Sequence, residues 1–453
     1  MGAGTAQGGA CLLISGKERK NMEFVVFAGV LLLLFIFMIV QELIQTKNQE
    51  KLFKKYLREN YGKEPPKEYS LERFARLGSY LERHKEEKQL DDITWNDLGM
   101  DEVFRRIDRT YSAAGEEYLY YTLRNISCGR EALEHLEEVV NWLQEQENIK
   151  VRIQLLMKRL GHLGKYSLYD YLDNLDYLGE RSNRKIVLEN LLYLPFLLLL
   201  FVQPAMGTIG IVLCMLWHIM TYFREKKVIE PYIISFAYVL RLIDVCEELE
   251  KQKIPVYRRE LDELREALKS LRELRRGAYW VMAGNQGKIG GNPLDILADY
   301  LRMILHLDIF QFNRMLEKLR KKTGQVETML AITGYLDMAI SVGGFRKSLE
   351  GYCIPKLEED TEKAFLHMKK GWHPLLSQPV KNSIRADRGI LLTGSNASGK
   401  STFLKMVAVN AVLAQTIHTC AAESYHAPIF QIFSSMALRD SMENGESYYI
   451  VEI

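Results

Sequence analysis

A glycine-rich loop that ends in a lysine and a hydroxyl residue is the part of the sequence best suited to chemistry. Residues 391–402 read Leu-Leu-Thr-Gly-Ser-Asn-Ala-Ser-Gly-Lys-Ser-Thr, which contains the pattern Gly-x-x-x-x-Gly-Lys-Ser. In such a loop, backbone N–H groups surround nucleotide phosphates, the lysine reaches the β- and γ-phosphate oxygens, and the serine hydroxyl ligates Mg²⁺. We therefore predict that ATP and Mg²⁺ bind here, with Ser401 as the metal ligand. The predicted ATP-binding residues are Gly394, Ser395, Asn396, Ala397, Ser398, Gly399, Lys400, Ser401 and Thr402.

An element on each side must hold this loop in place. Gly389–Thr393 is apolar and predicts a strand that enters the loop, and Phe403–Gln415 predicts a helix that leaves it. His426–Phe433 predicts a second strand. A strand before the loop and a helix after it favour a phosphate-binding loop over a glycine-rich turn in which Lys-Ser is incidental.

Two apolar segments are long enough to cross a membrane. Phe24–Val40 carries no charged side chain and is close to the ~20 residues that one span needs. Ile186–Phe223 is too long for one span and is interrupted at Gln203-Pro204, which predicts a helical hairpin of two spans. Buried core helices are the alternative for both segments, and their lengths favour the membrane.

Basic residues at both ends of the hairpin indicate its orientation, because positively charged flanks remain in the cytoplasm. We expect a multi-pass protein of the cell membrane with the nucleotide-binding part in the cytoplasm and an outside N-terminus. A cleaved signal peptide is disfavoured because no Ala-x-Ala site follows Phe24–Val40. Met22 is an alternative start. The flanking residues are Arg181, Arg184 and Lys185 before the hairpin and Arg224, Lys226 and Lys227 after it.

Composition limits the remaining function classes. The net charge is only +2, so no global attraction to nucleic acid or acidic lipid is expected. The cysteines show no Cys-x-x-Cys pair, which indicates reduced thiols rather than a disulfide or zinc framework. They are Cys11, Cys128, Cys214, Cys246, Cys353 and Cys420.

The sequence from about Asp91 onward, apart from the hairpin, resembles the MutS family of mismatch-recognition ATPases. Asp92–Leu123 is similar to the start of that family's helical core and lever region. Asn396 stands at the fourth place of a Thr-Gly-x-Asn-x-x-Gly-Lys-Ser-Thr loop and distinguishes this loop from most others of its class. The other motifs, in the family's order, are His373-Pro374, Asn382-Ser383-Ile384, Leu413-Ala414-Gln415 and Gly445–Ile453.

This resemblance implies roles for residues whose function cannot be assigned from motif spacing alone. It implies that Asn396 braces the loop near the γ-phosphate and that Val380, Asn382 and Ile384 form part of an adenine pocket. Ser447 is similar to the family's signature-loop serine, which reaches into the site of the opposite subunit, so a homodimer through the ATPase domain is expected. Binding of mismatched or structured DNA in repair is implied as well.

The fold class we expect is multidomain, with a mainly α-helical core and lever region, transmembrane helices, and a partial α/β P-loop ATPase domain. The expected divisions are a transmembrane N-terminal segment (1–44), a juxtamembrane helical linker (45–90), the first part of the helical core (91–185), the hairpin (186–223), lever and core helices (224–370), and an incomplete ATPase domain (371–453).

The sequence also departs from the family pattern. No mismatch-reading domain precedes Asp91, and Ala397-Ser398 replaces the usual Met-Gly. No run of four apolar residues ending in Asp-Glu lies between the loop and Ile453, so the ATPase domain is expected to be truncated and this chain to hydrolyse little ATP. A full-length form would be an ATP hydrolase.

Three functions are compatible with these features. The first is a membrane-anchored MutS-like ATPase that engages DNA as a dimer. The second is a membrane scaffold or signalling ATPase that has lost DNA recognition. An ABC-type transporter ATPase is weaker, because Asn396 and the Ser447 region resemble MutS and only three spans are predicted.

Overall fold

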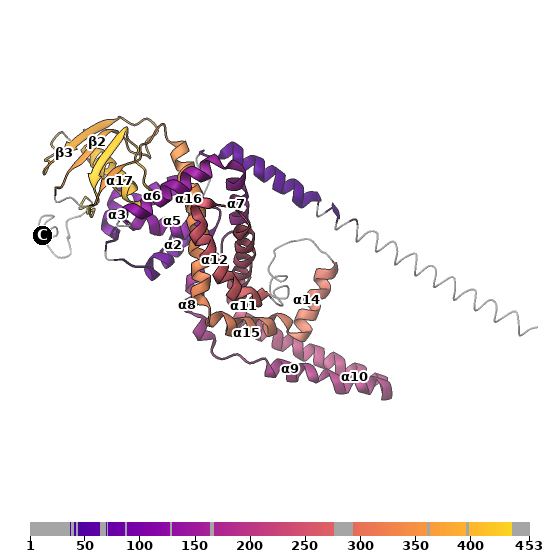
Figure 1. The fold of residues 1–453 in the computed structure, drawn as a ribbon. Coiled ribbons are helices and arrows are strands. Elements are labelled where there is room, and N and C mark those ends of the chain that lie inside the picture. Colours follow the sequence, from indigo (N-terminus) through magenta and orange to yellow (C-terminus); the bar gives the residue numbers. More distant parts are fainter. Residues whose placement is uncertain are drawn as a thin grey trace, which may run out of the picture. The chain divides into compact units, whose positions relative to one another are not determined.

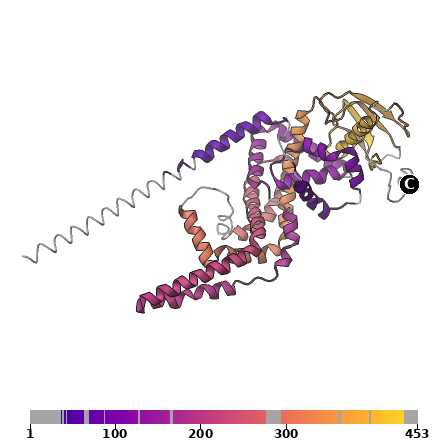
Figure 2. The same cartoon turned by 180° about the vertical axis from the view of Figure 1, so that it is seen from behind.

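The computed structural model describes residues 37, 40–41, 44–63, 69, 71–86, 88–126, 129–163, 167–275, 293–359, 363–395 and 398–436. The chain divides into two compact units, residues 1–61 and 62–453. In the first unit, residues 44–60 form a helix. The predicted span Phe24–Val40 lies outside the described residues except for residues 37 and 40. All further description concerns the second unit (Figures 1 and 2).

A bundle of helices forms the core of this unit. Its centre is α16 (Thr323–Ser348), which packs against α5, α6 and α12. By length and composition α16 is apolar enough to cross a membrane, but 83% of its apolar window is buried inside the protein, so other helices already cover it. The other elements are α2 (Leu71–Arg83), α3 (Asp92–Leu98), α4 (Met100–Ile107), α5 (Ala113–Arg124), α6 (Gly129–Glu145), α7 (Glu147–Leu160), α8 (Leu168–Asp173), α12 (Arg258–Leu271), α14 (Pro293–Leu305) and α15 (Leu307–Arg320), with short 3₁₀ turns at Leu175–Leu178, Pro255–Tyr257 and Arg272–Arg275.

The contact between α5 and α16 is close because small residues and one buried carboxylate meet there. Ser112 caps α5, since its hydroxyl accepts a hydrogen bond from the backbone N–H of Gly115 at 3.1 Å. Asp337 of α16 in turn accepts hydrogen bonds from the Ser112 hydroxyl at 2.6 Å and from the Ser112 N–H at 2.9 Å. A Cβ on Gly115 would lie 2.4 Å from Asp337 Oδ2, so this position requires glycine.

The predicted hairpin is a pair of packed helices that turns where the sequence indicated. Helices α9 (Arg184–Leu191) and α10 (Tyr193–Val202) lead to Gln203, and Pro204 begins α11 (Pro204–Glu250), which lies beside α10. Two windows, Arg184–Val202 and Pro204–Glu230, are long and apolar enough to cross a membrane, and only 6% and 33% of them are buried. Helix α11 continues without a break past Phe223, the predicted end of the hairpin.

A small mixed sheet carries the loop region. Its strand order is β1-β4-β2-β3, with β1 (Lys356–Glu358) parallel to β4 (Ser424–Pro428). Strand β2 (Leu366–Gly371) is antiparallel to both β4 and β3 (Asn382–Ala386). Helix α17 (Lys400–Ile417) contacts β2 on one side and α3, α5 and α6 on the other, so it joins the sheet to the helical body (Figure 1).

Candidate functional site

The candidate nucleotide site is the loop before α17 together with the first turn of that helix. Helix α17 begins at Lys400, which confirms the predicted helix at Phe403–Gln415. Gly399 precedes it with φ +87°, a left-handed conformation that glycine adopts without strain, and its carbonyl accepts a hydrogen bond from the Phe403 N–H at 2.8 Å. The first N–H groups of a helix have no partner within the helix and carry partial positive charge. The start of α17 is therefore suited to bind an anion.

The Lys400 side chain lies across the loop. Its Nζ donates hydrogen bonds to the carbonyl oxygens of Gly394 at 2.7 Å and Ser395 at 2.6 Å. The Ser398 N–H also donates to the Ser395 carbonyl, at 3.3 Å, which closes the turn. Gly394, Ser395, Ser398, Ser401 and Thr402 are exposed. Such a loop has room for an anion, and the Lys400 ammonium could exchange these carbonyl oxygens for the oxygens of a phosphate.

The segment that enters the loop differs from the prediction. Gly389–Thr393 was expected to be a strand, and the structure shows irregular chain there. A strand requires a neighbour to pair with its backbone N–H and C=O groups. Strand β3 is the edge of the sheet, and in the described part of the chain no strand pairs with residues 389–395. Leu391 is accordingly 88% exposed.

The second predicted strand is displaced for a local reason. His426–Phe433 was expected, whereas β4 spans Ser424–Pro428. Pro428 has no N–H to donate to a partner strand, and the strand ends there. The loop that follows turns toward α3, where the Ser434 hydroxyl donates to Asp97 Oδ2 at 3.0 Å and the Met436 N–H donates to the same oxygen at 2.7 Å.

The other predicted site residues fall into two groups. Val380 lies in the chain before β3, while Asn382 and Ile384 lie within this edge strand. The Asn382 side chain donates to the Val380 carbonyl at 3.0 Å, and no hydrogen bond among the described residues joins these three to the loop or to α17. Asn396, Ala397 and Ser447 lie outside the described residues.

A metal ion would depend on Ser401 and on the nucleotide. Within the described ranges, no group of three or more His, Cys, Asp or Glu side chains is placed to hold a metal ion. Mg²⁺ keeps several waters and is commonly held by phosphate oxygens and one or two protein oxygens. The exposed Ser401 hydroxyl at the start of α17 fits that role.

Two buried amides hold α17 against the sheet; sequence reasoning did not identify Asn410, and it included Gln415 in a family motif without assigning it this role. Asn410 donates to the Trp372 carbonyl at 3.0 Å and accepts from the Ala421 N–H at 2.7 Å, so it bridges β2's end and the chain leading to β4. Gln415 accepts from the Phe430 N–H at 2.7 Å. An amide on the buried face of an otherwise apolar helix is the signal that would have identified both.

The far end of α17 is fixed to the helical body by one arginine. Arg346, near the end of α16, has a fully buried side chain, and its guanidinium contacts Glu137 of α6 at 2.7 and 3.1 Å. It also donates to the Thr419 hydroxyl at 2.8 Å and to the carbonyls of His418 at 3.0 Å and Ile417 at 3.3 Å. These bonds satisfy the carbonyls at the end of α17. We call this group the Arg346 joint.

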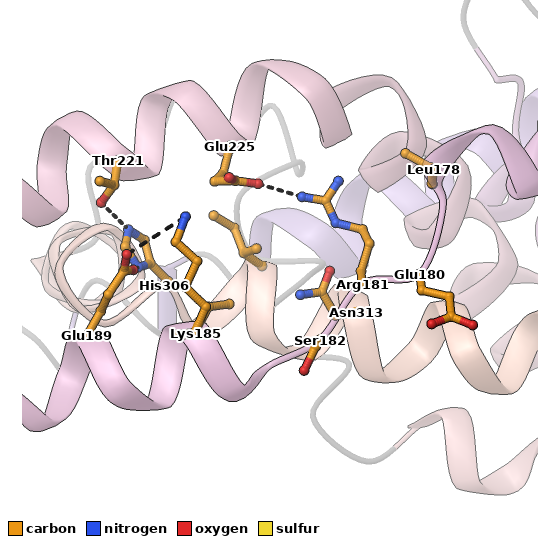
Figure 3. A pocket seen from close by; sticks show the side chains of 12 residues that line it. Leu178, Glu180, Arg181, Ser182, Lys185, Glu189, Thr221, Glu225, His306 and Asn313 are labelled. Carbon is orange, nitrogen blue, oxygen red and sulfur yellow. Dashed lines mark hydrogen bonds and ion pairs between the residues drawn. The ribbon is translucent and has the colours of Figure 1, made fainter.

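A separate cavity of about 230 Å³ lies where the base of the hairpin meets α15 (Figure 3). Arg181 pairs with Glu225 at 2.6 Å across it, and the Thr221 hydroxyl lies 3.4 Å from His306 Nε2. Near the cavity, the Asn190 side chain donates to the Leu305 carbonyl at 3.0 Å. None of the predicted nucleotide-binding residues lines this cavity, and its contacts attach the hairpin to the helical body.

Comparisons with known proteins show what parts of this chain are similar to. A family model described as MutS domain V matches residues 390–453. A DNA mismatch repair protein MutS of Acholeplasma laidlawii is 32% identical over 148 residues, which is 31% of this chain and 17% of that protein. The protein of the same name from Leptospira interrogans is 30% identical over 163 residues, which is 33% of this chain and 19% of that protein. The one from Thermotoga maritima is 31% identical over 123 residues, which is 25% of this chain and 15% of that protein. The chain spans less than a fifth of the length of these relatives.

Proposed function

We propose that this chain is a membrane-anchored, MutS-like protein that binds ATP and Mg²⁺ through residues 394–402. The observation that carries the proposal is a loop with Lys400 lying across it at the start of α17, inside the stretch that is similar to MutS domain V. Lys400 would contact the β- and γ-phosphates, and Ser401 would ligate the Mg²⁺ that neutralises them. Asn396 would brace the loop, and Val380, Asn382 and Ile384 would contribute to the adenine pocket.

The Arg346 joint gives a bound nucleotide a route to the helical body. The phosphates bind at one end of α17, and the joint fixes the other end of the same helix to α16 and α6. In this proposal α17 moves as a rigid body when the phosphates bind, so a shift at the loop is transmitted to α16 through the Arg346 joint. Ser447 would complete the site of an opposite subunit, which makes the working form a homodimer through the ATPase domain.

The hairpin supplies the membrane anchor in this proposal. Its exposed apolar side chains follow α10 and the first half of α11. Monomeric soluble proteins rarely expose a large continuous apolar surface, whereas a membrane would cover one. Both ends of the hairpin, and the ATPase domain with them, lie on the cytoplasmic side of the cell membrane.

Charged substitutions on the hairpin are expected to prevent insertion. Leu198 and Leu213 are 68% and 61% exposed, and an arginine near the centre of a span costs about 2.5–3.5 kcal/mol. In a chain from which residues 1–44 have been removed, so that the predicted span Phe24–Val40 cannot hold it, we expect the L198R/L213R double variant to be released from membranes by alkaline carbonate, whereas the same chain without the two substitutions resists extraction. Ile93→Arg is the matched control, because Ile93 is 59% exposed on α3 outside the hairpin. Release of the unsubstituted chain by carbonate would refute the anchor.

DNA is the first candidate ligand of the helical body, because the similar proteins are named DNA mismatch repair proteins. We expect affinity for mismatched or branched duplexes to fall with added salt, with a logarithmic slope of about −0.9 for each phosphate neutralised. The measurement is fluorescence anisotropy of labelled mismatched, branched and fully paired duplexes, from low to physiological salt, with the chain in lipid nanodiscs.

The alternative is a membrane scaffold or signalling ATPase that has lost DNA recognition. The net charge of only +2 favours it, because the chain as a whole then exerts little attraction on nucleic acid. A salt slope indistinguishable from zero on all three duplexes would exclude the DNA function and leave this alternative, provided that ATP binding in the same preparation is retained.

A further inference from the structure

Two cysteines face each other beside the Arg346 joint. Cys353 follows α16 and precedes β1, and Cys420 follows α17 and precedes β4. They form an isolated antiparallel bridge in which each backbone N–H donates to the other residue's carbonyl, both at 3.0 Å. Residues paired in this way have Cα atoms about 5.5 Å apart, inside the ~4.4–6.8 Å range of protein disulfides. Both thiols are free in this structure.

The two thiols have different surroundings. Cys420 is fully buried, with its sulfur 3.5 Å from the Asn410 carbonyl oxygen, and burial raises the pKa of its thiol. Cys353 is half-buried, and its pKa is lowered by a hydrogen bond from the Cys420 thiol and, against the effect of desolvation, by the Tyr425 N–H. A half-buried thiol with a lowered pKa beside a fully buried thiol is the arrangement of an attacking cysteine and its resolving partner.

We propose that Cys353 and Cys420 form a reversible redox site whose oxidant is a low-molecular-weight disulfide of the glutathione type. The Cys353 thiolate attacks one sulfur of that disulfide, the external S–S bond breaks, and one small thiolate leaves. Cys420 then gives up its proton, and its thiolate attacks the Cys353 sulfur and displaces the second small thiolate. Two protein thiols are oxidised, one external disulfide is reduced, and the two protons end on the two released thiols.

The position of the site determines what the bond would do. The closed loop from 353 to 420 contains β1, β2, β3, the phosphate-binding loop and α17, so the bond ties the chain after α16 to the chain after α17. The redox chemistry is independent of nucleotide binding and stands whether or not the loop binds ATP.

The test is to incubate the whole chain in nanodiscs with oxidised glutathione, block the remaining thiols by alkylation, and map the trypsin digest by mass spectrometry. We expect the peptide Ser348–Lys356 to be joined to Met406–Arg439, with two hydrogens fewer than the sum of the two peptides. Dithiothreitol should restore both. Stable glutathione on Cys353 without the cross-link, or no oxidation of either cysteine, would overturn the proposal.

Single variants separate the two roles. Cys420→Ser should retain glutathione on Cys353, because no resolving thiol remains, and Cys353→Ser should leave Cys420 unmodified. Cys246→Ser is the control, since Cys246 is buried in α11 and should leave the cross-link intact. If Cys420→Ser fails to fold, peptide mapping of the natural chain by itself tests whether the cross-link between Cys353 and Cys420 forms.

Discussion

Replacing Arg346 with methionine is expected to lower the free energy of unfolding by about 3–5 kcal/mol, the usual cost of removing one partner of a buried ion pair. The side chain of Arg346 is fully buried, and that of Glu137 is 19% exposed. Without the guanidinium, Glu137 loses its bidentate partner, and the carbonyls of Ile417 and His418 lose a donor. The measurement is the urea midpoint of tryptophan fluorescence for both proteins in the same detergent.

The control for this variant is Arg130→Met on α6. Arg130 pairs with Glu134 at 2.6 Å, but both side chains are more than half exposed, so solvent screens the pair and only a small change in the urea midpoint is expected. Equal midpoints for the Arg346 and Arg130 variants would show that the joint contributes little.

The free energy of unfolding should depend on pH through the Arg346 joint. Desolvation by burial raises the pKa of Glu137, but hydrogen bonds from His418 and Arg346 outweigh it and lower this pKa from 4.5 to about 2. Because the folded-state pKa is depressed, this stabilisation is fully present above pH 4.5 and is lost as the pH falls toward 2. The Arg346→Met variant should lose part of that pH dependence.

Local features of the fold were predictable because they depend on neighbours in sequence. Gly-Lys-Ser places a helix start at Lys400, and Gln203-Pro204 stops one apolar helix and starts the next, since proline is accepted at the first helical position. The apolar stretch of α16 is as hydrophobic as a span, and only the packing of α5, α6 and α12 around it shows that it belongs to the core.

Features that depend on distant residues were not predictable from one sequence. Arg346 and Glu137 are 209 residues apart, and nothing local marks either as a partner of the other. Cys353 and Cys420 were interpreted as scattered reduced thiols, because only the bridge between the ends of α16 and α17 brings them together. The strand predicted at Gly389–Thr393 was wrong because an apolar run becomes a strand only beside a partner strand.

Replacing Lys400 with alanine is expected to weaken ATP binding by at least about 100-fold, since a hydrogen bond to a charged group is worth about 1.5–3 kcal/mol and each 1.4 kcal/mol is tenfold in affinity. Lys400 Nζ makes two hydrogen bonds to loop carbonyls, and in the proposed complex it would contact two phosphates instead. Lys369→Ala is the control, because Lys369 is an exposed lysine of the same sheet that pairs with Glu423 at 2.5 Å. Its affinity for ATP should equal that of the natural chain.

The most direct test of the central claim is a calorimetric titration of ATP into the chain in lipid nanodiscs, with and without Mg²⁺, beside the Lys400→Ala and Lys369→Ala variants. We expect saturable, Mg²⁺-dependent binding to the natural chain and to the Lys369 variant, and none to the Lys400 variant. ATP binding of equal strength in all three proteins, or in none of them, would contradict the assignment of residues 394–402 as a nucleotide site.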